Sequence, residues 1–236
     1  MWMYDIDVSR RDTTHARVRY LEQMPIMARP GSRAWVRQSL ALRVVESRAD
    51  VSMVNDIWLR RHYLARTPTG VRVKRLSIVG DLAGVTGSQA GCAVAVTVAL
   101  QPSNSRVFQS LRAGLELHPC NVLELVRCWR ADDLTPELVP DLMPYTLRRV
   151  VGGGNGVRGL GDEWNARKLT GGLEAPARLV LTYADGGMGH DGGLYKGAGG
   201  VYVGKTVNGK IAYAWALDAA LREPLRAYGA AVKQET

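Results

Sequence analysis

The order of apolar segments along the chain predicts an α/β (α+β) protein with a mixed central sheet flanked by helices. Apolar residues make up 46% of the 236 residues, which is enough to build a sizeable core. Short runs rich in β-branched residues alternate with longer segments of helical periodicity, in the order β-α-β-β-β-α-β-α-β-β-α. This order excludes a closed barrel and a helical bundle.

The first half of the domain contains one helix among several strands. Leu40 to Glu46 is an alternating apolar run and predicts a strand. A helix is expected from Ser47 to Leu64, with the turn residues Thr67 to Gly70 as its stop. Further strands are expected from Val71 to Val79 and from Ala93 to Leu100.

The second half begins with a strand from Val122 to Trp129 and a helix from Pro136 to Val151 that two prolines interrupt. A glycine-rich loop follows from Gly152 to Gly161, and a short helix is expected from Glu163 to Leu169. The remaining elements are three strands and a terminal helix, expected at residues 177–183, 200–203, 210–216 and 217–232.

Residues 1–36 are expected to form an N-terminal basic and aromatic arm, and residues 37–236 a single domain. The arm has little periodicity and contains the breaker Ala28-Arg29-Pro30-Gly31. Its first residues mix acids with arginines and lack the apolar centre of a secretory signal. No apolar run approaches the roughly 20 residues of a membrane span. We therefore expect a cytoplasmic protein without a membrane partner.

Charge and cysteine content restrict the function classes. The formal net charge is +9, and arginines recur in pairs such as Arg60-Arg61 and Arg148-Arg149. This surplus favours a polyanionic partner such as DNA, although a solvated basic surface or an anionic nucleotide cofactor also explains it. The cysteines Cys92, Cys120 and Cys128 form no CxxC pair, which argues against a disulfide framework and a zinc knuckle.

The most informative stretch is YADGGMGHDGGLY, from Tyr183 to Tyr195. It places Asp185 at the end of a predicted strand and carries His190 and Tyr195 into a short helix. Ligands of open α/β sheets bind in crevices beyond strand ends, so these groups indicate a site. The alternative is a glycine-rich turn with incidental polar residues. We expect His190 to cap the short helix; a metal site with Asp185 or His62 is the other interpretation.

Two further places can carry chemistry. His62 and Tyr63, beside the Arg60-Arg61 pair, offer a base and a stacking ring, or else a solvent-facing helix end. Arg127 lies inside an apolar strand, before Trp129, and must find a carboxylate or a phosphate. An internal ion pair is as good an explanation of Arg127 as a role in a site.

These three places, in this order, resemble the Mom family of phage DNA-modification proteins, which have a GNAT-like N-acyltransferase fold. The matching pieces are His62-Tyr63, LVRCWRADD from Leu125 to Asp133, and the stretch from Tyr183 to Tyr195. The resemblance implies a V-splayed sheet and a transferase that adds a small amide-containing group, of carbamoylmethyl or methylcarbamoyl type, to adenine N6 in double-stranded DNA. That modification protects the DNA from host restriction in the host-cell cytoplasm. The family's functional positions correspond to His62, Tyr63, Arg127, Asp185 and Tyr195.

A mechanistic hypothesis assigns roles to these residues. Adenine N6 lies inside the duplex, so the base must be flipped into a pocket, where Tyr63 or Trp129 can stack on it. Asp185 or His62 accepts the proton, Tyr195 protonates the leaving group, and Arg127 binds the donor. His190 is a substrate-binding candidate. The candidate DNA-binding residues are Arg60, Arg61, Arg148, Arg149 and Arg158.

The group donor is left open between acetyl-CoA and another activated two-carbon compound. Iron, bound by two histidines and a carboxylate, is a further possible cofactor. Arg149 to Gly154 matches the R-x-x-G-x-G pattern of coenzyme A loops but follows a predicted helix, so we interpret it as a helix end. Two other functions remain open, namely a GNAT acyltransferase for a small amine or protein amino group and a non-catalytic DNA-binding protein. A homodimer is also compatible with the sequence.

Overall fold

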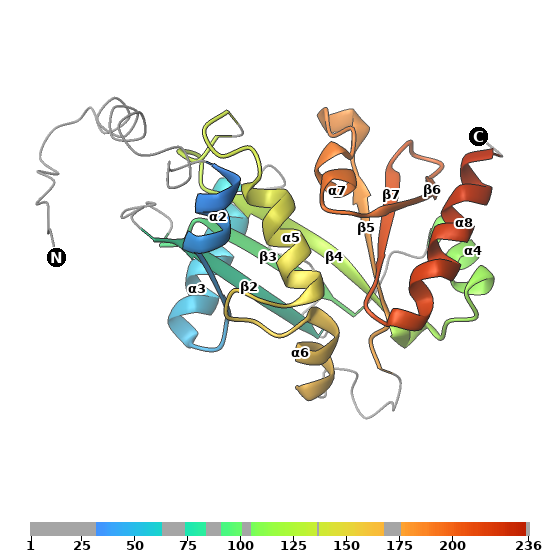
Figure 1. Cartoon of the computed structure of the whole chain (residues 1–236), viewed down its shortest axis with the longest axis horizontal. Coiled ribbons are helices and arrows are strands. Elements are labelled where there is room, and N and C mark those ends of the chain that lie inside the picture. Colours follow the sequence, from blue (N-terminus) through green and yellow to red (C-terminus); the bar gives the residue numbers. More distant parts are fainter. Residues whose placement is uncertain are drawn as a thin grey trace, which may run out of the picture.

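A seven-stranded mixed sheet with helices on both faces forms the protein, in the strand order β1-β2-β3-β4-β5-β7-β6 (Figure 1). The computed structural model describes residues 32–62, 74–83, 91–100, 105–135, 137–167 and 176–234. The strands are β1 (Leu40–Val44), β2 (Arg75–Leu82), β3 (Val94–Ala99), β4 (Val122–Arg130), β5 (Leu179–Ala184), β6 (Val201–Lys205) and β7 (Ile211–Ala216). The mixed sheet flanked by helices that the sequence predicts is confirmed.

The two central strands, β4 and β5, pair for only a short distance and then separate. They are parallel and in register from Val122↔Leu179 to Glu124↔Leu181. Beyond this point, the Thr182 hydroxyl donates a hydrogen bond of 3.1 Å to the Leu125 carbonyl. β4 continues to Arg130 without β5 beside it, so the sheet opens into a V toward the carboxyl ends of both strands (Figure 1).

An irregularity in β4 lies at the start of this opening. Thr97 of β3 pairs with Arg127, whereas the next residue, Val98, pairs with Leu125, so Val126 is an extra residue in β4. Such a bulge rotates the residues that follow it relative to the strand. The bulge lies immediately before the segment Arg127-Cys128-Trp129, which contains the predicted site residues Arg127 and Trp129.

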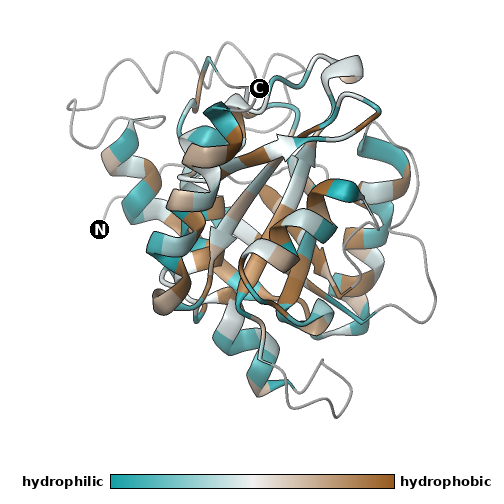
Figure 2. Ribbon diagram, turned by 90° about the vertical axis from the view of Figure 1, so that its right-hand side faces the viewer, coloured by the Kyte–Doolittle hydropathy of each residue, from teal (hydrophilic) through white to brown (hydrophobic). Residues whose placement is uncertain are grey.

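The helices divide the core into two parts. The helices are α2 (Arg33–Ser39), α3 (Arg48–Asp56), α4 (Arg106–Gly114), α5 (Leu142–Gly152), α6 (Leu160–Ala166), α7 (Gly193–Gly197) and α8 (Arg222–Gln234), with a π-helical turn η1 (Ile57–Arg61) after α3. One core joins α2, α3, α5 and α6 to strands β1–β4, and a second joins α4 and α8 to β5, β6 and β7. In Figure 2 the apolar colour concentrates in the strands and the inward helix faces.

Two helices were not predicted from the sequence. Both begin at a serine whose side chain accepts a backbone N–H, Ser32 for α2 and Ser105 for α4. α2 covers residues 33–36 of the expected arm and buries Val36 completely, so these residues belong to the domain. Residues 1–31 lie outside the described part of the chain.

Element boundaries differ from the prediction chiefly at the helices. α5 begins at Leu142, six residues after the predicted start, and α8 begins at Arg222 after a short 3-10 turn. Within the described ranges, no helix is both long and apolar enough to cross a bilayer.

Candidate active site

Predicted site residues from four elements meet at the open end of the V. His62 follows η1, Arg127 and Cys128 lie on β4, Asp185 and His190 follow β5, and Tyr195 lies on α7. The positive charges of Arg127 and His190 both act on His62, and His190 acts on Asp185. The hydroxyl of Tyr195 lies 3.9 Å from the Cys128 sulfur. Residues separated by up to 133 positions thus share one region.

His62 is a buried imidazole at this site. It is 8% exposed and lies edge-on to Trp58, with ring centroids 5.5 Å apart. Burial, the charge of Arg127 and the charge of His190 lower the pKa of His62 from 6.5 to about 4. His62 is therefore neutral at physiological pH and can accept a hydrogen bond or a proton. Tyr63, its predicted partner, lies outside the described residues.

The lowered pKa of His62 predicts that folding depends on pH. The pKa of the His62 imidazole is 6.5 in the unfolded chain and about 4 in the folded chain, so between these pH values the unfolded chain binds more protons. Acidification through this window therefore destabilises the fold, by about 3 kcal/mol at most. We expect His62→Gln to remove this component, which denaturant unfolding at a series of pH values measures. Parallel pH profiles of the wild type and the variant would contradict the assignment.

Asp185 is held in place by a residue that the sequence analysis missed. Lys210, at the start of β7, places its ammonium 3.0 Å from the Asp185 carboxylate. The same carboxylate accepts the Gly187 N–H at 3.2 Å. Hydrogen bonding and charge from Lys210 lower the pKa of Asp185 below its usual range, so Asp185 is ionised at neutral pH.

His190 does not cap α7, contrary to our expectation. The cap position is Gly192, at a φ of 82°, and the carboxylate of Asp191 accepts the Gly193 N–H at 2.8 Å. A side chain at position 192 would collide with the Tyr213 ring, because a Cβ atom added there would lie 2.3 Å from it. His190 is exposed instead, on the loop between Asp185 and α7, where it contributes to lowering the pKa values of His62 and Asp185.

Aromatic contacts orient Tyr195. Its ring centroid lies 6.0 Å from that of Tyr213 and 6.0 Å from that of Trp215, both on β7. Its hydroxyl is directed at the Cys128 sulfur across the V. Burial raises the pKa of the Cys128 thiol, so this cysteine presents a neutral side chain to Tyr195.

β4 contributes one residue to the candidate site, Arg127, and one to the hydrophobic core, Trp129. The Arg127 guanidinium donates to the Val126 carbonyl at 2.6 Å, and its charge contributes to lowering the pKa of His62. Trp129 is 6% exposed and belongs to the core under β1–β4, so we assign it to packing rather than to stacking on a base.

The predicted DNA-binding arginines fall into two groups. Three of them pair with carboxylates: Arg60 with Asp56 at 2.7 Å, Arg61 with Asp132 at 4.0 Å and Arg158 with Glu163 at 3.3 Å. Arg148 and Arg149, on α5, have no carboxylate partner within the described ranges. Arg148 donates to the Gly197 carbonyl at 2.5 Å, and Arg149 to the Tyr145 hydroxyl at 3.0 Å.

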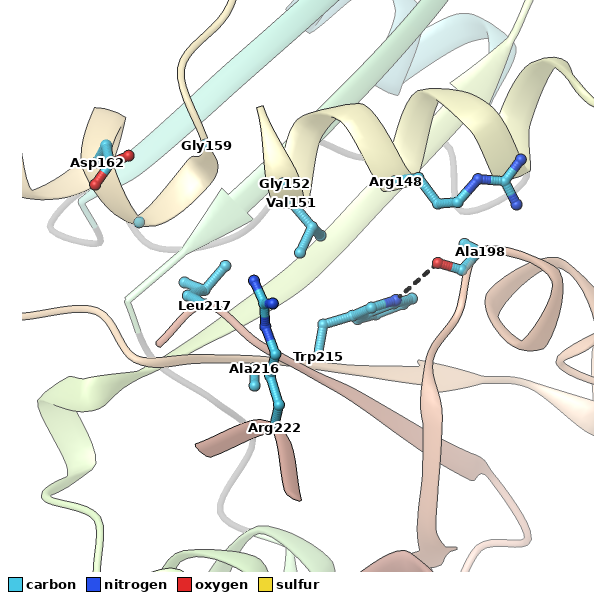
Figure 3. Close-up of a pocket in the computed structure, with 11 residues that line it drawn as sticks. Arg148, Val151, Gly152, Gly159, Asp162, Ala198, Trp215, Ala216, Leu217 and Arg222 are labelled. Atoms are coloured by element: carbon cyan, nitrogen blue, oxygen red, sulfur yellow. Dashed lines mark hydrogen bonds between the residues drawn. The ribbon is translucent and has the colours of Figure 1, made fainter. Parts of the chain in front are cut away.

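A cavity of about 340 Å³ lies between α5 and the end of β7 (Figure 3). Trp215 forms one wall, and its indole N–H donates to the Ala198 carbonyl at 3.2 Å. The guanidinium of Arg222 points into the cavity toward Val151, and Asp162 lies at the opposite wall (Figure 3). Neither Arg222 nor Asp162 belongs to a sequence motif, so neither was predicted as a site residue.

The R-x-x-G-x-G match is a helix end, as expected. α5 ends at Gly152, and Gly153 and Gly154 have φ values of 85° and 110°. A pyrophosphate loop has its glycines between a strand and a helix, whereas the segment from Ala131 to Asp141 between β4 and α5 contains none and carries four carboxylates. These residues do not fit the coenzyme A pyrophosphate, and we derive no step through that cofactor. Among the described residues, no group of three or more His, Cys, Asp and Glu side chains is placed to hold a metal ion.

Comparison with known proteins gives similarity at the level of structure. No protein-family model and no curated protein matches the sequence. Aminoglycoside acetyltransferase AAC(6')-Ib in complex with coenzyme A is 14% identical, with a TM-score of 0.45 over 80% of this chain and 98% of that one. Spermidine N-acetyltransferase from Vibrio cholerae, in complex with CoA and spermine, is 11% identical, with a TM-score of 0.44 over 76% and 96% of the two chains. The likeness concerns the fold alone.

Proposed function

We propose that this protein is a transferase that acts on an amino nitrogen, and that its acceptor is N6 of adenine in double-stranded DNA. The observation that carries the proposal is that His62, Arg127, Asp185 and Tyr195 lie around the open end of the V. Charge effects connect Arg127 and His190 with His62, and His190 with Asp185, and Tyr195 contacts Cys128, the residue after Arg127. A carboxylate, a neutral imidazole, a guanidinium and a phenol together supply the groups that nucleophilic transfer from an activated donor requires.

Asp185 is the proton acceptor in this proposal. The N6 lone pair is delocalised into the purine, so N6 is a weak nucleophile and its proton is lost only as the new bond forms. Attack on the donor carbon makes the nitrogen cationic and strongly acidic, so a base of low pKa is sufficient. Lys210 keeps Asp185 ionised for this step. His62, neutral at physiological pH, can accept a hydrogen bond from the substrate.

Tyr195 and Arg127 act on the donor side. The bond between N6 and the donor carbon forms while the bond from that carbon to the leaving group breaks. The Tyr195 hydroxyl gives its proton to the leaving group. After transfer, Asp185 releases its proton to solvent and Tyr195 takes one from solvent. The Arg127 guanidinium stabilises negative charge that develops on the donor oxygen. Cys128 and the ring contacts with Tyr213 and Trp215 position the Tyr195 hydroxyl.

The DNA acceptor rests on the resemblance to the Mom family and on the arginine surplus of the chain. A second candidate is an acyltransferase for a small amine. The carboxylates of Asp185 and Asp191, on one exposed loop, favour it because they attract a cationic substrate. The two acetyltransferases to which the fold is similar act, by their names, on an aminoglycoside and on spermidine.

The deciding experiment is mass spectrometry of nucleosides from plasmid DNA co-expressed with this protein. We expect a deoxyadenosine adduct whose mass identifies the transferred group. The control is the double variant Asp185→Ala/Tyr195→Phe, which should give unmodified DNA. A DNA adduct that persists in the double variant would assign the chemistry to other residues.

Unmodified adenine from well-expressed protein would instead favour the small-amine acceptor. In that case, purified protein should transfer a group to spermidine, and release of free thiol from acetyl-CoA would also overturn the conclusion that the segment before α5 does not fit coenzyme A. The absence of both a DNA adduct and transfer to spermidine would contradict the transferase proposal.

A further inference from the structure

We propose that four arginines of α2 and α5 form the surface on which the phosphate backbone of duplex DNA docks, beside the candidate active site. This arginine surface consists of Arg33, Arg37, Arg148 and Arg149. The inference rests on the proposed function, because it names where the DNA substrate binds. It adds Arg33 and Arg37 of α2 to the predicted DNA-binding residues, and it leaves out Arg60, Arg61 and Arg158.

The arginine surface is a concavity formed by segments far apart in the chain. α2 packs against α5, which brings Arg33 and Arg37 next to Arg148 and Arg149 although more than 100 positions separate them. The concavity has a volume of about 600 Å³ and is completed by Asp141, Pro144, Tyr145 and Gly197. α2 and α5 lie together on one face of the sheet (Figure 1).

Among the described residues, one carboxylate, that of Asp141, lines the arginine surface. Asp141 forms an ion pair with Arg33. Within the described ranges, no carboxylate pairs with Arg37, Arg148 or Arg149. Like charges gathered around one hollow repel one another, and an anion bound there relieves that repulsion. The surface is therefore built to attract negative charge.

Neutral groups hold two of these arginines in fixed positions. Arg149 donates to the Tyr145 hydroxyl at 3.0 Å and lies 5.1 Å from the centroid of the same ring. Arg148 lies 6.0 Å from that centroid and donates to the Gly197 carbonyl. Ordering a guanidinium before binding reduces the entropy lost when a phosphate arrives. Tyr145 thus supports the charges without neutralising them.

The location suits a DNA substrate. Gly197 ends α7, which carries Tyr195 two residues earlier, so Arg148 links the arginine surface to the candidate site. We expect a phosphate backbone on this surface to bring a flipped base toward the V between β4 and β5. Arg60, Arg61 and Arg158 are partly neutralised by Asp56, Asp132 and Glu163, so we expect them to contribute less.

Fluorescence anisotropy with a labelled short duplex tests the proposal, using the charge reversal Arg37→Glu in the full chain. Arg37 is exposed and makes no side-chain contact on which folding would depend in the described ranges. We expect binding about tenfold weaker, with the slope of log K against log salt concentration shallower by about one. The matched control is Arg226→Glu on α8, which makes the same change of charge far from α2 (Figure 1).

Four outcomes distinguish the inference from the proposed function. Weaker binding by Arg37→Glu alone supports the arginine surface. Equal weakening by Arg226→Glu would reduce the effect to net charge and overturn the surface. If the wild-type protein modifies DNA but Arg37→Glu binds DNA as tightly as the wild type does, the arginine surface is overturned and the proposed function stands. A wild-type protein that neither binds nor modifies DNA would overturn both.

A mononucleotide is the other occupant of stated chemistry. Thermal unfolding with added ADP examines this alternative. Stabilisation of the wild type by ADP that Arg37→Glu abolishes, with DNA binding unchanged, would assign the surface to a soluble nucleotide and overturn DNA docking. Equal stabilisation of both proteins by ADP, together with weaker DNA binding by Arg37→Glu, would support DNA docking on the arginine surface.

Discussion

Replacing Asp185 with asparagine should lower the rate of adenine modification by a factor of about 10² to 10⁴, because the amide cannot accept a proton. The asparagine side chain keeps an oxygen that can accept the Gly187 N–H, so the turn after β5 should persist. Binding of duplex DNA should change little, since Asp185 lies on the loop after β5 and not on the arginine surface. Nucleoside mass spectrometry over time measures the rate, and anisotropy measures binding.

Asp191→Asn is the matched control for the loss of charge on the same loop. Its amide oxygen can accept the Gly193 N–H as the carboxylate does, so α7 should keep its start. We expect nearly normal modification by this variant. If both variants lost activity equally, the loop charge rather than a proton acceptor at Asp185 would explain the effect. Loss of DNA binding by Asp185→Asn would also remove its catalytic assignment.

The strands and the position of the site were predictable because both depend on local patterns. The β5 and β7 segments are short apolar runs between turn residues, and the structure has strands within two residues of the expected bounds. Polar residues directly after β5 marked the crevice at its end. Asp185, His190 and Tyr195 therefore lie within one sequence window and could be found together.

The helices α2 and α4 show where local reasoning was incomplete. Ser105 followed by Val107, Phe108 and Leu111 is an N-cap before an apolar face, and this signal for α4 was present in the sequence. α2 has only seven residues and a single fully buried side chain, Val36, so its stability comes from packing against α5. No local pattern predicts such a helix.

Tertiary contacts account for what the sequence could not predict about the site. Lys210 pairs with Asp185 only because β7 lies beside β5 in the sheet. The depressed pKa of His62 depends on burial and on the charges of Arg127 and His190, which are 65 and 128 positions away in the chain. Arg33 and Arg37 join Arg148 through the packing of α2 on α5. Each of these pairings requires the fold before it can be recognised.

Tyr195→Phe should reduce the rate of transfer by a factor of about 10² to 10⁴ while leaving DNA binding intact, because it removes only the proton donor to the leaving group. Phenylalanine keeps the ring contacts with Tyr213 and Trp215, so the position of α7 should not change. Single-turnover assays on duplex DNA measure the rate.

Tyr202→Phe on β6 is the matched control for Tyr195→Phe, since it removes a phenol hydroxyl from a ring that also contacts Tyr213. A donor with a good leaving group needs no proton, so it should restore much of the rate in Tyr195→Phe and change little in the wild type. This selective rescue separates proton donation from a structural role of the hydroxyl beside Cys128. A rate that stays low with every donor would show that the hydroxyl orients the site instead.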